Sequence, residues 1–520
     1  MKKIQLFVLM ILSFCCVKTY GQNSDSDIRA KGGEMFRFDQ QHAPTDTYTD
    51  YIKSHPSQKF SYNRTFISQP SGASNGRYSI KAMSKIIVIA DSALYSQLTF
   101  SIDRYIQDIQ NAYNCNAVFV KVTGGTYQNI KNLILADSTD LDGVVLIGDI
   151  PVAWYEIAND YNTYGYAQWP CDLYYMDLNG TWTDSDINSI YDTHTGDVEP
   201  EIFVGRISTA NMGVLLNEVT GMQNYLDKDH AFWAGNIPIN KKFGLSYVDE
   251  DWVPYTYFFT DIQYLYGAAY YDSIGQDNAI FGKTDYLSRL DSARYEFIQI
   301  SSHSDYLTHY LTGGSISSTE IFNLGPKAIG YNLYACSACR WTSTNSSSSS
   351  CFMGGAYVYN SSPTSLVAVG STKTGSLLGF NYLFQPLGNG DCMGVALVNW
   401  WQNYIGSYHS NDDVSWFYGI SIIGDPMINF LSINPTASIG NNTENVKSCT
   451  VYPNPANERI TIKTIQKSEI IITDINGKFI QSLSANEGTT TIVVSGLAKG
   501  VYFVSIQTDE TLTTEKFIKY

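Results

Sequence analysis

Between residues 85 and 430, short apolar runs alternate with stretches in which apolar residues recur every three or four positions. The uninterrupted runs predict strands that are buried on both faces, and the recurring pattern, as in 98–109, predicts amphipathic helices. Strands that alternate with helices form a parallel sheet covered by helices. The predicted strands are 85–91, 116–122, 143–149, 201–208, 242–252, 295–305, 327–339 and 363–372.

Both ends of the chain differ from this central part. Residues 22–84 are polar with few apolar runs, which predicts an irregular leader or pro-segment. A Pro-, Asn- and Ser-rich linker at 433–445 precedes residues 446–520, whose short alternating strands predict a small all-β, immunoglobulin-like sandwich. We divide the central α/β part into a first subdomain, 85–230, and a second subdomain, 231–432.

The first residues have the parts of a secretory signal peptide. Lys2 and Lys3 precede an apolar core of about a dozen residues, and small and polar residues follow. This core is too short for a membrane span, and no later stretch is long and apolar enough. We therefore expect residues 1–21 to be removed during export and the mature chain to have no transmembrane segment.

The composition narrows the class of protein. The 520 residues are 44% hydrophobic, 14% aromatic and only 16% charged, which is typical of a globular extracellular protein with large cores. The formal net charge is −16, and no run of basic residues occurs. Because nucleic-acid binding needs clustered Lys and Arg, we expect no nucleic-acid partner.

The segment YNLYACSACRW, residues 331–341, ends an apolar run with Cys336 and Cys339. Of the nine cysteines, seven remain after removal of the signal peptide, so at least one is outside any intramolecular disulfide. The spacing suits a metal site, a redox pair, a disulfide or a nucleophile. A structural zinc site needs a second pair of ligands, and none has the usual spacing here.

A cysteine nucleophile needs a histidine that accepts and returns its proton. His303 is the only histidine that ends an apolar strand pattern, FIQISSH, whereas the others lie in polar surroundings and are expected at the surface. In open α/β sheets, ligands bind at the carboxyl ends of the strands. We therefore expect His303 and one of the two cysteines to meet at that edge.

Several segments resemble a known family. FIQISSHSD, AIGYNLYAC and SCFMGGAYVYNSSPTSLVAVGST are similar to the catalytic core of the gingipain-type cysteine proteases of the caspase-like clan. GVVLIGD, EIFVGRIS and IIGDPMINF are similar to further segments of that family, so the resemblance covers about 85–430. It implies a caspase-like parallel-sheet sandwich with two subdomains, of which the second is catalytic.

The resemblance also implies roles for individual residues. Cys336 would be the nucleophile, with Cys339 as the alternative, and His303 would be the general acid and base. The peptide N–H groups of Cys336 and of the residue after the histidine would bind the oxyanion. The family has Gly after the histidine, whereas this chain has Ser304, which suits a less efficient enzyme or a non-catalytic relative.

The third member of the family's site is an acidic residue one strand earlier, which orients the imidazole. The matching segment is LSYVDEDW, and Asp249 is the expected residue. Glu250 and Asp251 are neighbouring alternatives, and a solvated loop or a calcium site would also explain three acidic residues in a row.

No cofactor is expected to be required, although structural calcium is an alternative. The loop DLNGTWTDSD offers oxygen ligands of the kind that calcium binds, but their spacing is not that of an EF-hand. The candidate ligands are Asp177, Asn179, Asp184 and Asp186.

The tail, about 445–520, resembles the C-terminal sorting domain of type IX secretion cargo. The resemblance rests on YPNP at 452–455, Asn476-Gly477, GVY at 500–502 and the terminal KFIK. It implies export across the inner and outer membranes to the cell surface or the medium, with the type IX secretion machinery as a partner.

These features together predict a secreted cysteine endopeptidase that hydrolyses proteins or peptides through an acyl-enzyme intermediate. A surface binding or adhesin-like protein on a degenerate protease scaffold is the alternative, and Ser304 favours it. A thiol transpeptidase that matures surface proteins is a third hypothesis.

Overall fold

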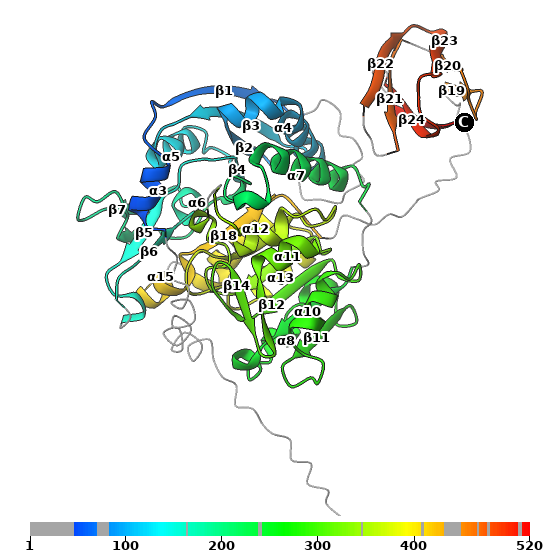
Figure 1. The fold of residues 1–520 in the computed structure, drawn as a ribbon. Helices are drawn as coiled ribbons and strands as arrows, with labels where there is room; N and C mark the ends of the chain where they lie inside the picture. Colours follow the sequence, from blue (N-terminus) through cyan, green and yellow to red (C-terminus); the bar gives the residue numbers. More distant parts are fainter. Residues whose placement is uncertain are drawn as a thin grey trace, which may run out of the picture. The chain divides into compact units, whose positions relative to one another are not determined.

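The computed structural model describes residues 46–69, 83–162, 165–237, 242–344, 347–406, 410–430, 449–464, 467–475, 479–507 and 512–520. These residues form two compact units: unit 1, which comprises those up to 430, and unit 2, which comprises those from 449 onwards. Figure 1 shows both as ribbons. The predicted signal peptide and linker lie outside the described residues.

An eleven-stranded sheet forms the centre of unit 1. All residues of its seven middle strands are buried, as uninterrupted apolar runs predict. In the spatial order given next, these are the fourth to the tenth strands. The spatial order is β1 (Ser61–Ile67), β3 (Asn116–Thr123), β2 (Lys85–Asp91), β4 (Gly143–Ile147), β9 (Phe203–Ile207), β18 (Ile420–Gly424), β17 (Val367–Ser371), β16 (Gly330–Tyr334), β12 (Phe297–Ser301), β10 (Gly244–Val248) and β11 (Tyr271–Gly275).

The sheet consists of two parallel halves that run in opposite directions. The first half is β3, β2, β4, β9 and β18, and the second half is β17, β16, β12, β10 and β11. The reversal lies between β17 and β18, which pair antiparallel with Val367 opposite Gly424. The carboxyl ends of the two halves therefore lie at opposite edges, and not at the single ligand edge that the strand pattern suggested.

The junction of the two halves is made by the strand of unit 1 that comes last in the chain. β18 lies between β9 and β17, in the middle of unit 1 in Figure 1. The sheet is thus continuous across the predicted boundary between 230 and 231. The predicted mixed α/β class with a largely parallel sheet is confirmed.

Part of the predicted leader is regular. The helix α3 (Tyr48–Ser54) begins after Thr47, which forms a capping box with Asp50. β1 pairs antiparallel with β3, from Ser61 opposite Thr123 to Ile67 opposite Ala117. The expectation of an irregular segment therefore does not hold for residues 46–69, where an exposed, polar edge strand lacks the apolar pattern used for the prediction.

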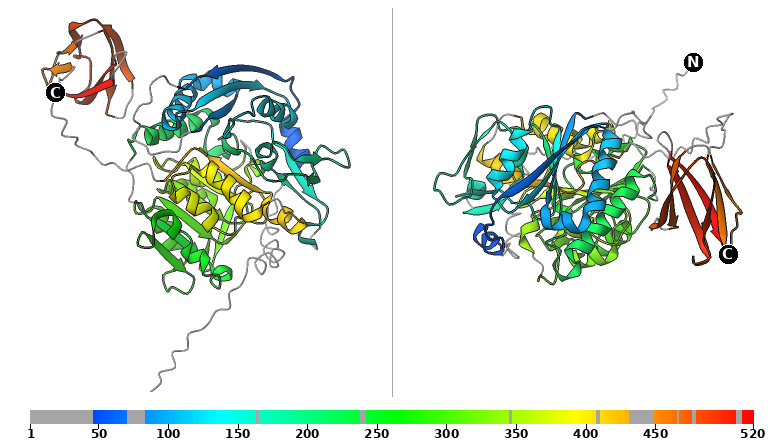
Figure 2. Two further views of the ribbon diagram at one scale, coloured as in Figure 1. Left: turned by 180° about the vertical axis from the view of Figure 1, so that it is seen from behind. Right: turned by 90° about the horizontal axis from the view of Figure 1, so that it is seen from above.

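Helices pack against the sheet, as the views in Figure 2 show. In the longest helix, α4, the Asp91 side chain accepts the N–H of Leu94 and caps the first turn, while the predicted apolar face is buried. The helices are α4 (Ser92–Tyr113), α5 (Tyr127–Ala136), α6 (Leu173–Met176), α7 (Glu218–Trp233), α8 (Tyr257–Thr260), α9 (Gln263–Tyr266), α10 (Lys283–Leu290), α11 (Ser318–Leu324), α12 (Met353–Val358), α13 (Asn381–Gly388), α14 (Met393–Trp400) and α15 (Asn411–Phe417).

Three small antiparallel sheets extend from the loops of unit 1. They are β5 (Trp154–Ile157) with β6 (Ala167–Pro170), β7 (Thr181–Thr183) with β8 (Thr193–Thr195), and β13 (His303–Ser304) with β14 (Thr308–Leu311) and β15 (Gly314–Ser317). Short helical turns occur at η1 (Asp160–Asn162), η2 (Gly213–Leu215), η3 (Glu250–Trp252), η4 (Trp341–Ser343) and η5 (Trp401–Ile405).

Unit 2 consists of two antiparallel sheets with a separate hydrophobic core, as the alternating pattern predicts. One sheet contains β19 (Cys449–Tyr452), β20 (Arg459–Thr464) and β23 (Gly488–Val493). The other contains β22 (Phe479–Ala485), β21 (Ser468–Asp474), β24 (Gly500–Gln507) and β25 (Leu512–Lys519). The predicted turn at Asn476-Gly477 lies outside the described residues.

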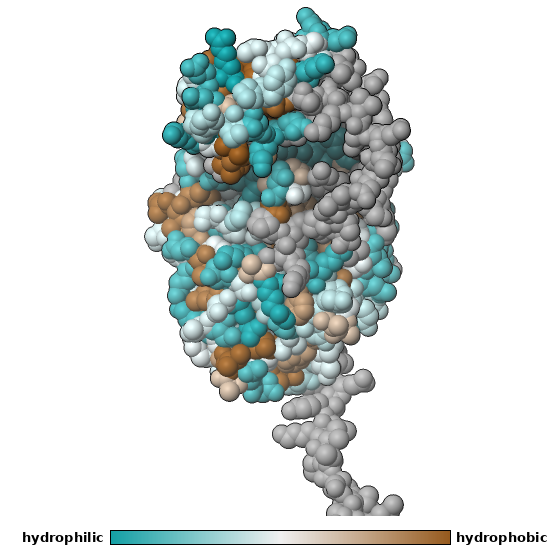
Figure 3. Space-filling model, turned by 90° about the vertical axis from the view of Figure 1, so that its right-hand side faces the viewer, coloured by the Kyte–Doolittle hydropathy of each residue, from teal (hydrophilic) through white to brown (hydrophobic). Residues whose placement is uncertain are grey.

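Figure 3 shows hydrophilic and hydrophobic residues mixed on one face of the molecule, with small separate groups of hydrophobic residues among hydrophilic ones. Across the described part of the chain, no helix combines the length and the apolar character that crossing a membrane requires.

Candidate active site

His303 and Cys336 follow neighbouring parallel strands of the second half. β12 and β16 pair with Ser301 opposite Tyr334, and each candidate comes two positions after one of these partners. The N–H of Ser302 donates to the Tyr334 carbonyl at 3.1 Å, so the two segments stay together beyond the sheet. His303 and Cys336 are therefore level with each other at one sheet edge, where they are 5% and 1% exposed.

Ser304 links the two segments directly. Its hydroxyl donates to the carbonyl of Cys336 at 2.8 Å and lies 2.9 Å from the carbonyl of Asp305. The residue is fully buried. The Ser304 side chain thus points into the protein, where it holds the cysteine segment.

Asp251 is the acidic residue against His303. The imidazole Nε2 lies 2.8 Å from Oδ2 of Asp251. Asp249, the expected residue, is bound elsewhere: it accepts the N–H of Glu250 at 2.8 Å and the hydroxyl of Thr312 at 2.8 Å. The chain makes a helical turn after Asp249, so Asp251, one of the two alternatives, and not the first choice is the residue that lies against the imidazole.

Trp252 forms an aromatic wall beside the imidazole. Its ring centroid lies 4.8 Å from that of His303 and 5.3 Å from that of Tyr334. The indole N–H donates to the Tyr334 hydroxyl at 3.0 Å, which fixes the wall in place. Packing against a fixed ring limits the orientations of the imidazole.

Residues 336–343, here called the cysteine loop, are fastened to the end of β17. The N–H of Ser337 donates to the Lys373 carbonyl and that of Cys339 to the Ser371 carbonyl, both at 2.9 Å. Ser337 has a φ of 54°, in the left-handed region. A non-glycine residue in this conformation costs on the order of 1 kcal/mol and persists where its surroundings enforce it, which is characteristic of functional sites.

Cys339 has the environment of a core residue. A Cβ placed on Gly354 or Gly370 would lie 3.0 or 2.9 Å from its Sγ, so both glycines make room for the sulfur. Burial raises the pKa of the Cys339 thiol well above its usual value, which disfavours the thiolate. Cys336 and Cys339 are not joined in a disulfide. Cys339 is thus held as a packed core side chain, in contact with the glycines of α12 and β17.

Two histidines that were expected at the surface are buried. The His194 ring lies 2.9 Å from an Asp177 oxygen and 2.8 Å from the Tyr418 hydroxyl, which are polar partners from distant segments. His309 is fully buried in β14, and burial lowers the pKa of its ring to about 3. A ring that stays neutral at physiological pH is poorly matched to carrying a proton.

The four candidate calcium ligands do not form one set. Asp177 binds N–H groups of its own loop, and Asp184 likewise accepts two backbone N–H groups. Within the described ranges, one group of at least three His, Cys, Asp or Glu side chains is close enough together for a metal: Glu156, Asp186 and Asp192. Structural calcium stays a prediction, and Asp186 alone belongs to both sets.

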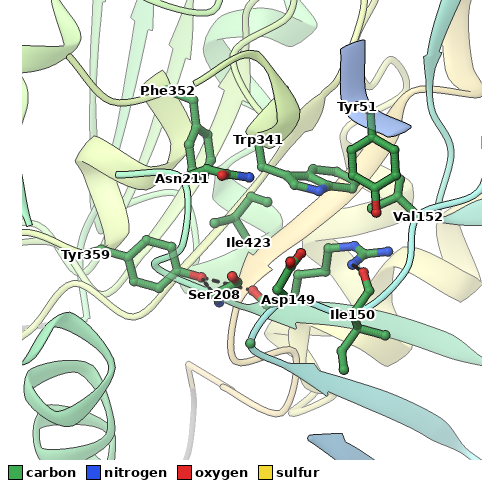
Figure 4. A pocket seen from close by; sticks show the side chains of 12 residues that line it. Tyr51, Asp149, Ile150, Val152, Ser208, Asn211, Trp341, Phe352, Tyr359 and Ile423 are labelled. Atoms are coloured by element: carbon green, nitrogen blue, oxygen red, sulfur yellow. Dashed lines mark hydrogen bonds between the residues drawn. The ribbon is translucent and has the colours of Figure 1, made fainter. Parts of the chain in front are cut away.

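A cavity separates the cysteine loop from the carboxyl edge of the first half. Trp341 from the loop, Tyr51 from α3, Asp149 after β4 and Ser208 after β9 line it, as Figure 4 shows. The guanidinium of Arg206 lies 4.7 Å from the Trp341 ring centroid. The cysteine loop thus begins at the edge of the second half and reaches that of the first.

Comparison with known proteins identifies the tail most directly. Residues 450–520 match the family described as the secretion system C-terminal sorting domain. Unit 2 therefore contains a sorting domain, which indicates export and agrees with the predicted function of the tail. None of the curated proteins matches the chain.

Two solved structures are similar to the chain at low identity. One is the crystal structure of the Arg-specific cysteine proteinase gingipain R (RGPB), which is 10% identical with a TM-score of 0.46 and covers 87% of this chain and 100% of its own. The other is the complex of Porphyromonas gingivalis RgpB pro- and mature domains. It is 10% identical with a TM-score of 0.45, and the match covers 84% of this chain and 100% of that one. Likeness at this level concerns the fold alone and gives no role to individual residues.

Proposed function

We propose that this protein is an exported cysteine endopeptidase with Cys336 as the nucleophile and His303 as the general acid and base. The observation that carries the proposal is the register of β12 and β16, which brings both residues level at one edge. Asp251 lies against the imidazole and supplies the third group. A thiol, an imidazole and an orienting carboxylate are the groups that thiol-based acyl transfer needs.

The reaction proceeds through a thioester. His303 takes the proton of the Cys336 thiol, and the thiolate attacks the carbonyl carbon of a peptide bond. The peptide N–H groups of Cys336 and Ser304 stabilise the oxyanion, and the imidazolium returns its proton to the leaving amine. Water, deprotonated by the same imidazole, then hydrolyses the thioester, while Asp251 stabilises the imidazolium.

The contacts of Ser304 bear on the alternative of a degenerate binding protein. Its side chain is buried against the carbonyl of Cys336, so the added atoms occupy the interior. In this proposal the peptide N–H of Ser304 serves as the oxyanion donor, as that of a glycine would, and the buried side chain is compatible with this role. A transpeptidase would form the same thioester and pass the acyl group to an amine, so the two enzyme hypotheses differ in their products.

The export route belongs to the same proposal. The sorting domain in unit 2 directs the chain out of the cell, and the predicted signal peptide supplies the first of two membrane crossings. Substrates are then proteins or peptides at the cell surface or in the medium, and the type IX machinery is the partner during export.

The decisive experiment compares the exported protein with its Cys336→Ala and Cys339→Ala variants. We expect Cys336→Ala to lower the cleavage of a peptide library by at least about 10³-fold and to abolish labelling by a thiol-reactive peptide analogue. Cys339→Ala is the matched control, three residues away, and should retain labelling. Thermal unfolding verifies that each variant folds. Cleavage that persists in Cys336→Ala, or a folded wild-type protein that neither cleaves nor labels, would refute the proposal.

A further inference from the structure

Arg340 is a nearly buried cation in the cysteine loop, four residues after Cys336. Its Nε lies 3.0 Å from Oδ1 of Asp46, and the two side chains are only 4% and 9% exposed. Asp46 belongs to the leader. An ion pair shielded from water is screened little by salt, and removal of one partner leaves an uncompensated charge. The contact therefore couples the leader to the cysteine loop strongly.

The other donors of Arg340 extend the connection. Nη2 donates to the Asp46 carbonyl, and Nη1 donates to the carbonyls of Gln168 in β6 and Thr372 after β17, each at 3.2 Å. The Ser343 hydroxyl at the end of the loop also donates to Oδ1 of Asp46, at 2.6 Å. One guanidinium thus joins the cysteine loop, the leader and the end of β17, where the loop is already fastened.

The leader is itself held along its length, so Asp46 has a fixed position. The Tyr48 N–H donates to the Gln168 side chain at 2.8 Å, and the His55 ring lies 3.2 Å from the Asp149 carboxylate. Beyond them, β1 forms a continuous ladder with β3. These contacts attach the leader to the first half of the sheet, while Asp46 attaches it to the loop of the second half.

We infer that residues 46–69 are a permanent part of the catalytic unit, and that Asp46 and Arg340 are positioning residues for Cys336. The inference rests on the proposed function. The leader contacts the loop at Arg340 and Ser343, four and seven positions beyond the nucleophile, and there it supports the loop. A removable inhibitory pro-segment would have to end before Asp46, and maturation cleavage is expected on that side of it.

The test uses the full chain with Asp46→Asn and the matched control Arg64→Gln. Arg64 anchors the same leader through Asp137, but this ion pair lies at the surface, with side chains 40% and 13% exposed, and joins β1 to the end of α5. We expect Asp46→Asn to lower kcat for peptide cleavage about tenfold or more with KM nearly unchanged, because misplacing a nucleophile slows chemistry without weakening substrate binding. Arg64→Gln should leave both values within about twofold.

A second measurement is independent of activity. In the Cys336→Ala background, Asp46→Asn should accelerate amide hydrogen exchange in residues 337–343, whereas Arg64→Gln should not. If Asp46→Asn fails to fold, Ser343→Ala removes one contact to the same carboxylate and should act in the same direction with a smaller effect. Equal exchange in the Asp46 and Arg64 variants would overturn the inference. A wild-type protein without peptidase activity would refute the proposed function. The exchange experiment would still test whether Asp46 holds the cysteine loop.

Discussion

The two halves of the central sheet use their carboxyl edges differently. In the second half, that edge carries His303 and Cys336, each two positions after the end of one of two adjacent strands. In the first half, the leader occupies the edge: His55 lies against Asp149, and a Cβ on Gly124 would meet Gln58 at 2.6 Å. Similar parallel strands with polar ends thus provide the candidate site at one edge and an attachment surface at the other. A polar strand end alone therefore does not identify a catalytic site.

The cysteine loop connects these two edges. It is fastened to the end of β17 in the second half, and its Trp341 packs against Arg206 of the first half. Changes in the first half should consequently reach the candidate nucleophile through this loop. The following experiments probe how separate the two halves are.

The largest effect is expected from the buried ion pair beneath Trp341. Arg206 binds both oxygens of Asp172, at 2.7 to 3.0 Å, and the two side chains are 5% and 2% exposed. We expect Asp172→Ala to leave Arg206 buried without its counter-charge and to lower the free energy of unfolding by about 3–5 kcal/mol. Chemical denaturation measures the loss.

The double variant Asp172→Leu with Arg206→Met serves as the control for this prediction. It removes both charges and should restore much of the stability, because no charge remains buried alone. If the single and double variants are equally stable, the pair does not stabilise the first half in the way proposed.

The next largest effect is expected from replacing Asp251 or Asp249, the two residues that could orient His303. Asp251→Asn should lower kcat by about tenfold to 10²-fold, because the amide no longer stabilises the imidazolium. Asp249→Asn should leave kcat nearly unchanged and lower the thermal midpoint, since Asp249 binds Glu250 and Thr312. Steady-state kinetics and thermal unfolding of both variants, measured side by side, check this assignment. The reverse pattern would restore Asp249 as the orienting residue.

A pH effect is expected where α7 meets the end of β18. Burial and the neighbouring charge of Asp425 raise the pKa of Asp229 well above its usual value, and burial raises the pKa of Asp425 to about 6. The folded state therefore binds more protons than the unfolded chain. The stability that the protonated carboxyl pair contributes is fully present below a pH of about 4 and is lost as the pH rises through about 6 and above.

Replacement of Asp229 tests this dependence. We expect the free energy of unfolding of the wild type to fall by about 1–2 kcal/mol more than that of Asp229→Asn between pH 5 and pH 8. Denaturant unfolding at several pH values gives both slopes. Parallel slopes would show that the carboxyl pair does not hold an additional proton in the folded state.

The smallest effect is expected at the outer edge of the first half. Arg64→Gln breaks the surface ion pair with Asp137 and should change the free energy of unfolding by less than about 1 kcal/mol. High salt should mimic the variant, because exposed charges are screened. A larger loss in denaturation experiments would mean that β1 contributes more to the sheet than its exposed side chains indicate.

Much of the fold could be predicted because the pattern of apolar and polar residues along the chain indicates which strands and helix faces are buried. β2, β12 and β16 were found from uninterrupted apolar runs, and the sandwich of unit 2 from alternation. Strand direction could not be predicted, since the reversal at β17 and β18 depends on the connection between them and not on apolar content. The exposed β1 lacked the pattern altogether.

The candidate site was predictable to a similar extent. His303 could be named because it ends an apolar run, whereas the choice of Cys336 over Cys339 came from the family resemblance. Asp251 could not be separated from Asp249, since three acidic residues are consecutive and a single helical turn decides which one reaches the ring. The burial of His194 depends on Asp177 and Tyr418, which are 17 and 224 positions away and give no local signal.

The place of β18 has a consequence for the order in which the protein can be completed. Because the last-made strand of unit 1 joins the two halves, a growing chain that stops before residue 420 contains two half-sheets that are not yet joined to each other and have exposed apolar edges. The sorting domain begins at residue 450, after the linker. The two half-sheets can therefore join before the sorting domain has been made, at a stage when the chain has its predicted signal peptide but not yet its second export signal.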